Sequence, residues 1–182
     1  MFTPTLQFVP LFALLILAAT VDVRERRIPN WLNLAIALTG FFQSFRPHHT
    51  LTPTQSLAGM GIGFVLPLIL FILNAIGGGD VKLLAAVGAW VGPINILLIF
   101  VLKDLVGFFI VLTQATYQGR LKAVVKNSTV MALNLVHVRE VGLETVQQTG
   151  LSCRSIDKPL PMAVPILAAV VLLQFLRPGG FR

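Results

Sequence analysis

The amino-acid sequence predicts an all-α integral membrane protein that crosses the membrane several times, with about six transmembrane helices. Of the 182 residues, 55% are hydrophobic and only 12% are charged, whereas a soluble domain carries about 25% charged residues. The hydrophobic residues also fall in long runs, separated by polar segments or by Gly and Pro. Such runs are typical of helices that cross a bilayer. We therefore expect one membrane-embedded domain over residues 1–182.

Six apolar runs are the candidate spans, and the fourth of them is short. The run 81–91 ends at Gly92-Pro93, and at about 1.5 Å per residue it cannot cross a bilayer by itself. We expect it to be a partial helix that begins below the membrane surface. In the run before it, Gly59, Gly61 and Gly63 would permit close helix packing. In chain order the runs are 5–21, 31–45, 57–76, 81–91, 94–113 and 160–176.

The distribution of Lys and Arg predicts how these spans are oriented. No basic residue precedes the first run, which is therefore interpreted as a retained span and not as a cleaved signal peptide. With the N-terminus outside, ten of the fourteen Lys and Arg residues fall in cytoplasmic segments and three fall outside, in agreement with the positive-inside rule. This orientation puts Asp22 and Asp80 at the same, cytoplasmic end of the membrane.

A long polar stretch, about 114–158, separates the last two spans. Its apolar residues recur at roughly helical spacing, which predicts a cytoplasmic amphipathic segment. Two placements are open for it. It would lie on an anionic membrane surface, or it would pack against the cytoplasmic side of the protein itself.

Several functional classes are excluded by composition. The net charge is +7, but no aromatic interleaving or basic-region motif accompanies it, so we expect no nucleic-acid partner. The single Cys153 excludes an intrachain disulfide and a CxxC metal site. His48 and His49 are adjacent, lack the i, i+4 spacing of a helical ligand pair and have no acid or Cys nearby. We therefore predict neither a metal nor a cofactor.

Two carboxylates beside apolar runs form the candidate site. Asp80 follows the glycine run Gly77-Gly78-Gly79, and Asp22 ends the first span. A charged side chain at the centre of a transmembrane helix costs about 2.5 to 3.5 kcal/mol on insertion scales, so its presence suggests a function. The glycines would allow a tight turn and a close approach of another chain. Each acid also has a simpler interpretation: Asp22 as a solvated loop acid beside arginines, and Asp80 as a helix N-cap.

If the two acids meet, their chemistry is that of an aspartic protease. Two carboxylates that share one proton hydrolyse a peptide bond without a metal or a nucleophilic side chain, because one accepts a proton from water while the other donates one. A third acid, Asp104, follows Lys103 within the fifth run. Adjacent residues on a helix point about 100° apart, and for this pair we favour a structural polar contact with a neighbouring span over catalysis.

These residues resemble a known family. Asp22 followed by Arg27-Ile28-Pro29-Asn30, and then GGGDVKLLAAVGAWVGP from Gly77 to Pro93, resembles the type IV prepilin leader peptidases, which are GxGD membrane aspartyl proteases. The resemblance implies cleavage of a prepilin leader at the cytoplasmic face of the bacterial inner membrane, before the hydrophobic pilin helix. It implies Asp22 and Asp80 as the catalytic pair, with motif support from Gly77, Gly78, Gly79, Lys82, Pro29 and Asn30.

The sequence also departs from the larger members of that family. Those members carry a cytoplasmic domain with paired CxxC motifs and N-methylate the new pilin terminus; the single Cys153 gives zinc and methylation no support. The chain is more similar to the peptidases of tight-adherence (Flp-type) pilus systems. The partners implied are Flp-type prepilins and pseudopilins, membrane lipid, and pilus or secretion assembly proteins.

A different functional class competes with this interpretation. A non-enzymatic membrane protein, either a small ion- or proton-coupled transporter or a pilus or secretion assembly subunit, would use Asp80 and Asp104 for ions or protons. Half-helices with charged ends occur at transporter sites. That alternative would call for an inverted repeat, and none is visible in the sequence.

Overall fold

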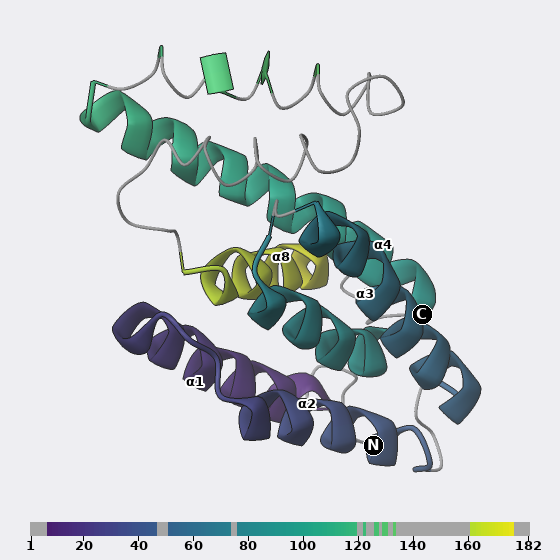
Figure 1. Cartoon of the computed structure of the whole chain (residues 1–182). Coiled ribbons are helices and arrows are strands. Elements are labelled where there is room, and N and C mark those ends of the chain that lie inside the picture. The colour runs from purple at the N-terminus through teal and green to yellow at the C-terminus, as the bar shows by residue number, and fades with distance from the viewer. Residues whose placement is uncertain are drawn as a thin grey trace.

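The computed structural model describes residues 7–46, 51–73, 76–119 and 161–176, together with residues 122, 126, 127, 129, 130 and 133. Within these residues all regular secondary structure is helical, which confirms the all-α class. The elements are α1 (Val9–Glu25), α2 (Asn30–Gln43), α3 (Pro53–Ile72), α4 (Gly78–Tyr117) and α8 (Ala163–Leu176). Figure 1 shows them as one bundle, with α8 beside α1 and α4.

Two of the helices, α3 and α4, are long and apolar enough to cross a membrane, and α8 is a shorter apolar helix. Large apolar side chains are exposed along both long helices, among them Phe64, Ile69, Phe108 and Phe109. Exposed apolar surface of this extent is typical of a face that meets lipid. The helices therefore indicate a membrane protein, while the six spans and the outside N-terminus stay predictions.

The predicted break between the fourth and fifth runs lies at Gly92, inside α4. Gly92 has φ 79° and ψ 178°, a backbone conformation that favours glycine, and Pro93 follows it. Leu84 before the bend and Ile96 after it both lie against Gly63 of α3. The two limbs of α4 therefore pass the same point of α3 in opposite directions (Figure 1). The first limb is short, as predicted, but no loop separates it from the second.

Pro93 leaves one backbone carbonyl of α4 without its helical hydrogen bond, and a side chain of α3 replaces that bond. Because proline has no N–H, the carbonyl of Ala89 loses its usual helical donor four residues later. The hydroxyl of Ser56, which is completely buried on α3, donates to that carbonyl oxygen at 2.7 Å. Ser and Thr side chains commonly satisfy backbone groups that a proline frees within a membrane. This contact holds the beginning of α3 against the bend of α4.

The first limb of α4 packs on α3 through glycines. A Cβ atom added at Gly59 would lie 2.2 Å from the carbonyl oxygen of Gly88, and one at Gly63 would lie 2.5 Å from that of Leu84. No side chain fits at either position, so the two backbones approach directly. The prediction of close packing is confirmed for Gly59 and Gly63. It is wrong for Gly61, which points away from α4 and has nothing within 4 Å.

Helix α2 packs on the other face of the first limb of α4. The indole N–H of Trp90 donates to the carbonyl oxygen of Ile36 at 2.7 Å. Gly40 leaves the space for that ring, since a Cβ there would lie 2.5 Å from the Trp90 Cδ1 atom. Phe8 at the start of α1 also packs near Trp90, with 6.4 Å between the ring centroids. The first limb of α4 is thereby enclosed, and its position is set from both sides.

The predicted boundaries shift in most of the helices, and three of the shifts bear on the site. Helix α1 continues to Glu25, so Asp22 lies in its last turn and not in the loop after it; Arg26, with φ 54°, is the C-cap of the helix. The N-cap of α2 is Pro29, and Asn30 is the first helical residue. Helix α4 extends to Tyr117 and so takes in the first residues of the predicted segment 114–158. Beyond residue 119, that segment lies outside the described residues apart from the six positions named above, as do Cys153, His48 and His49.

Candidate active site

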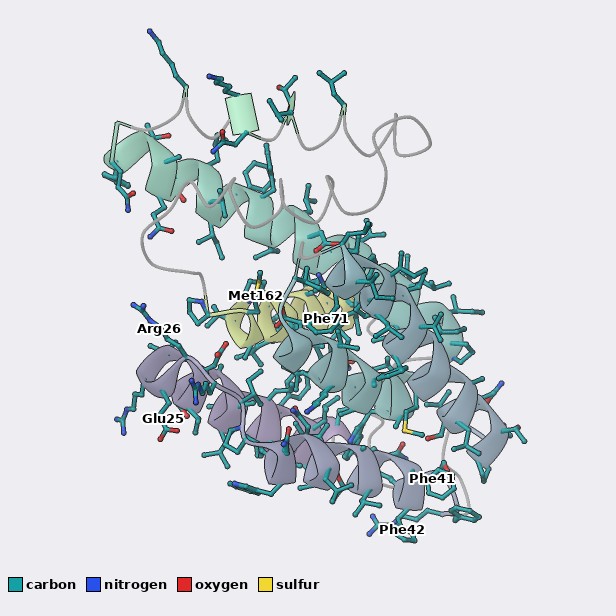
Figure 2. The ribbon with its side chains drawn as sticks, in the orientation of Figure 1. Glu25, Arg26, Phe41, Phe42, Phe71 and Met162 are labelled. Carbon is teal, nitrogen blue, oxygen red and sulfur yellow. The ribbon has the colours of Figure 1, made fainter. Side chains whose placement is uncertain are left out.

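Asp22 lies at the end of α1 and is held by the beginning of α8. Its side chain is buried, with 6% of the residue exposed. Its Oδ2 atom accepts a hydrogen bond of 2.9 Å from the backbone N–H of Ala163, the first residue of α8. The first N–H groups of a helix have no partner within the helix, and Asp22 supplies one. In Figure 2, Arg26 and Met162 mark these two helix ends.

Asp80 lies in the first turn of α4 and is equally buried, with 5% exposed. Its backbone N–H donates to the carbonyl oxygen of Gly77 at 3.1 Å, and Gly77 is the extended N-cap of the helix. A Cβ added at Gly77 would lie 3.8 Å from the Asp80 Oδ2 atom, and one at Gly78 would lie 3.4 Å from Phe71. These are ordinary contact distances. The close approach predicted for this glycine run is found instead at Gly59 and Gly88.

The two sequence elements that carry the resemblance lie against each other. Lys82 Nζ donates to Asn30 Oδ1 at 2.9 Å and so joins the first turns of α4 and α2. Ile28 lies against Gly79, where an added Cβ would be 4.0 Å from its Cδ1 atom. Pro29, the N-cap of α2, adopts φ −60° and ψ 137°, which places Asn30 at the start of that helix. The loop after Asp22 is therefore docked on the beginning of α4.

Asp22 and Asp80 lie at the same end of the bundle, because the loop after Asp22 is docked on the beginning of α4. The charged groups close enough to act on Asp80 are Asp22, Lys103 and Asp104. Lys103 is buried in the second limb of α4, forms an ion pair with Asp104, and lies 4.7 Å from the centroid of the Phe100 ring. Lys103 and Asp104 thus pair with each other, and the expected polar contact with a neighbouring span stays a prediction. Among the described residues, no group of three or more His, Cys, Asp or Glu is placed to hold a metal ion.

Sequence reasoning missed one contact and one residue near this site. The amide of Ala163 carries no side-chain signal, and only the prolines around it mark the start of α8. Asn33, one turn after Asn30, is buried, and within the described part of the chain neither of its amide atoms has a hydrogen-bond partner. The signal available in the sequence was that Asn33 is a polar residue on the same face of α2 as the buried Ile36.

These features define a helical membrane protein with two buried carboxylates at one end of its bundle. Residues 9–112 match the family model described as the type IV leader peptidase family. Because the match covers more than half of the chain, the protein belongs to that family.

The chain is similar to two proteins of known name. Over 93 residues the chain is 30% identical to the "Type 4 prepilin-like proteins leader peptide-processing enzyme" of Escherichia coli O78:H11, a match that covers 47% of this chain and 35% of the relative. Over 85 residues it is 31% identical to the "Preflagellin peptidase" of Methanocaldococcus jannaschii, covering 44% and 36%. The chain thus spans about a third of the length of the curated relatives it matches. No solved structure matches it.

Proposed function

We propose that the protein is a membrane-embedded aspartic endopeptidase that removes the leader peptides of type IV prepilins, with Asp22 and Asp80 as its catalytic pair. The observation that carries this proposal is the burial of two carboxylates, from α1 and α4, at the same end of the bundle, where the loop after Asp22 docks on the beginning of α4. Membership of the type IV leader peptidase family and the names of the two relatives support the substrate class.

In the proposed reaction the pair holds one proton between its two carboxyl groups, because two close carboxylates do not both ionise easily. The ionised group accepts a proton from water, and the resulting oxygen attacks the carbonyl carbon of the scissile peptide. The protonated group donates its proton to the carbonyl oxygen, which gives a neutral tetrahedral diol. Collapse of the diol breaks the C–N bond, and the amine leaves with a proton returned from the pair.

The remaining motif residues have supporting roles in this proposal. The contact between Lys82 and Asn30 keeps the loop after Asp22 docked on α4. Gly77 begins α4, and its carbonyl oxygen accepts the backbone N–H of Asp80. The amide of Ala163 orients the Asp22 carboxylate. These groups fix the two acids relative to each other, and such positioning supplies much of the rate of an enzyme.

On the sequence resemblance we further propose Flp-type prepilins and pseudopilins as the substrates. The cleaved bond then lies at the cytoplasmic face of the bacterial inner membrane, where the positive-inside count puts both acids. The segment 114–158 lies on the same side in this arrangement. Pilus or secretion assembly proteins are candidate partners for it.

The test is cleavage of a Flp-type prepilin in membranes by the wild type and by Asp22→Asn and Asp80→Asn. Asparagine keeps the shape of each side chain and removes its proton chemistry. We expect both variants to lose cleavage by at least 1000-fold while they still insert at wild-type abundance, because neither half of the pair acts alone. Asp104→Asn is the control for a nearby carboxylate outside the pair: it should still cleave, with a loss far smaller than that of either variant of the pair.

Two results would contradict the proposal. Near-full cleavage by either Asn variant would show that the pairing is wrong. A wild type that cuts none of several prepilins would remove the peptidase assignment and favour a transporter or an assembly subunit. Both outcomes are read from the same membranes, with protein abundance measured in parallel.

A further inference from the structure

Lys103 is a buried cation that has no role in the reaction described above. Lys103 is only 6% exposed, and among the described residues it is the one buried Lys or Arg. It belongs to the second limb of α4, in a helix apolar enough to cross a membrane. A buried charge in such a segment is costly and calls for a partner.

The fold of α4 brings this cation to the height of Asp80. The two limbs are level at residues 84 and 96, because both contact Gly63 of α3. The two limbs run in opposite directions, and each rises about 1.5 Å per residue. Asp80, four residues before Leu84, is therefore level with Phe100, four residues after Ile96.

The side chain of Lys103 reaches back along its own helix. Its ammonium group lies 4.7 Å from the centroid of the Phe100 ring, one turn before its own Cα. Side chains on helices lean in this direction, toward the N-terminus. The ammonium therefore stands at the level of Asp80, and it is among the charges that act on that carboxylate.

Few other positive charges in the described residues could act on the Asp80 carboxylate. Helices α2, α3 and α8 carry no ionisable side chain along their lengths. Asp22 on α1 and Asp104 on α4 are both acidic. The remaining charges at the end of α1, which are Arg24, Glu25, Arg26 and Arg27, are all exposed. Lys82, on the same limb as Asp80, is exposed and donates to Asn30. A pair that works with one shared proton carries one negative charge, and Lys103 is the buried positive charge that stands at the level of Asp80.

We propose that Lys103 is a positioning residue that supplies the positive charge balancing the Asp22–Asp80 pair, with Asp104 holding its ammonium in place. The proposal rests on the proposed peptidase function and extends it to a residue outside the family motifs described above. Its physical content is that a nearby cation stabilises the singly charged pair in surroundings that solvate charge poorly. Lys103 does not touch the substrate in this arrangement, and its effect is exerted through the two acids.

The experiment is the pH dependence of prepilin cleavage in membranes, with kcat and KM measured for the wild type and Lys103→Met. Methionine keeps the length of the side chain and removes its charge. Without the cation the carboxylate forms less readily, so both limbs of the pH–rate profile should move to higher pH, by about one unit for a charge several ångströms away. We expect this shift to lower kcat at the wild-type optimum by up to about fivefold, with KM unchanged. Lys103→Arg keeps the charge and should retain the wild-type profile.

A double variant separates this role from a purely structural ion pair. Lys103→Met leaves Asp104 without its partner, and an unpaired charge opposes insertion into the membrane. Lys103→Met combined with Asp104→Leu removes both charges, so this variant should insert. We expect the double variant to shift in the same direction but by less, because the charge of Asp104, which opposes that of Lys103, is removed as well. A wild-type profile in either Met-containing variant overturns the proposal and leaves the Asp22–Asp80 pair standing. If the wild type itself cuts no prepilin, the proposed function fails, and the role of Lys103 falls with it.

Discussion

The hydrogen bond from Ala163 to Asp22 offers the sharpest test of the site, because one substitution removes its donor and little else. Ala163→Pro deletes the backbone N–H that Asp22 Oδ2 accepts at 2.9 Å. Ala163 is the first residue of α8, and proline is favoured at that position of a helix, where the N–H has no helical partner. The helix should therefore persist while the carboxylate loses its anchor.

The size of the effect follows from the kind of bond that is lost. Hydrogen bonds to charged groups contribute about 1.5 to 3 kcal/mol, and about 1.4 kcal/mol corresponds to a tenfold change in rate. If the whole contribution is needed to hold Asp22 in its reactive orientation, kcat falls about 10- to 100-fold. KM should change little, because the amide contacts Asp22 and is not assigned to the substrate.

The assay is cleavage of the same prepilin by membranes that contain equal amounts of wild type and variant. Val164→Pro is the matched control: it places proline one residue later in the same turn and keeps the amide of Ala163. We expect the control to stay within about threefold of the wild type, since the donor survives. Equal rates for Ala163→Pro and the wild type would refute the reasoning, as would an equal loss in both proline variants.

Two further predictions concern stability, measured as thermal unfolding in detergent, and they stand beside those already made for the two acids and for Lys103. Gly59→Ala should destabilise the protein by about 1 to 3 kcal/mol, because its Cβ would meet the Gly88 carbonyl oxygen at 2.2 Å. Gly61→Ala, with nothing within 4 Å, should be neutral, and equal effects would contradict the packing described for α3 and α4. Ser56→Ala should cost about 1 to 3 kcal/mol, because the Ala89 carbonyl would stay buried without a donor. Thr54→Ala, at an exposed position of the same helix, should change stability by less than about 0.5 kcal/mol.

Local features of the chain were predictable from the sequence alone. Long apolar runs predicted the helices, and Gly92-Pro93 predicted the bend in α4, because proline and glycine act on their own stretch of backbone whatever packs around it. The arrangement of Asp22 and Asp80 at one end of the bundle followed from counting the segments between them. The family also followed from short motifs, since the matching residues are close together in the chain.

The contacts that complete the site were decided only by the tertiary structure. The amide of Ala163 is 141 residues from Asp22, and a backbone N–H has no sequence signature because nearly every residue carries one. Which glycines face a neighbouring helix depends on the rotation of α3, so Gly59 and Gly61 could not be told apart from spacing. Lys103 reaches the level of Asp80 only because α4 folds back at Gly92. The sequence by itself determined the helices, the bend and the two acids; the packing of α3, α4 and α8 decided what surrounds those acids, because such contacts join residues far apart in the chain.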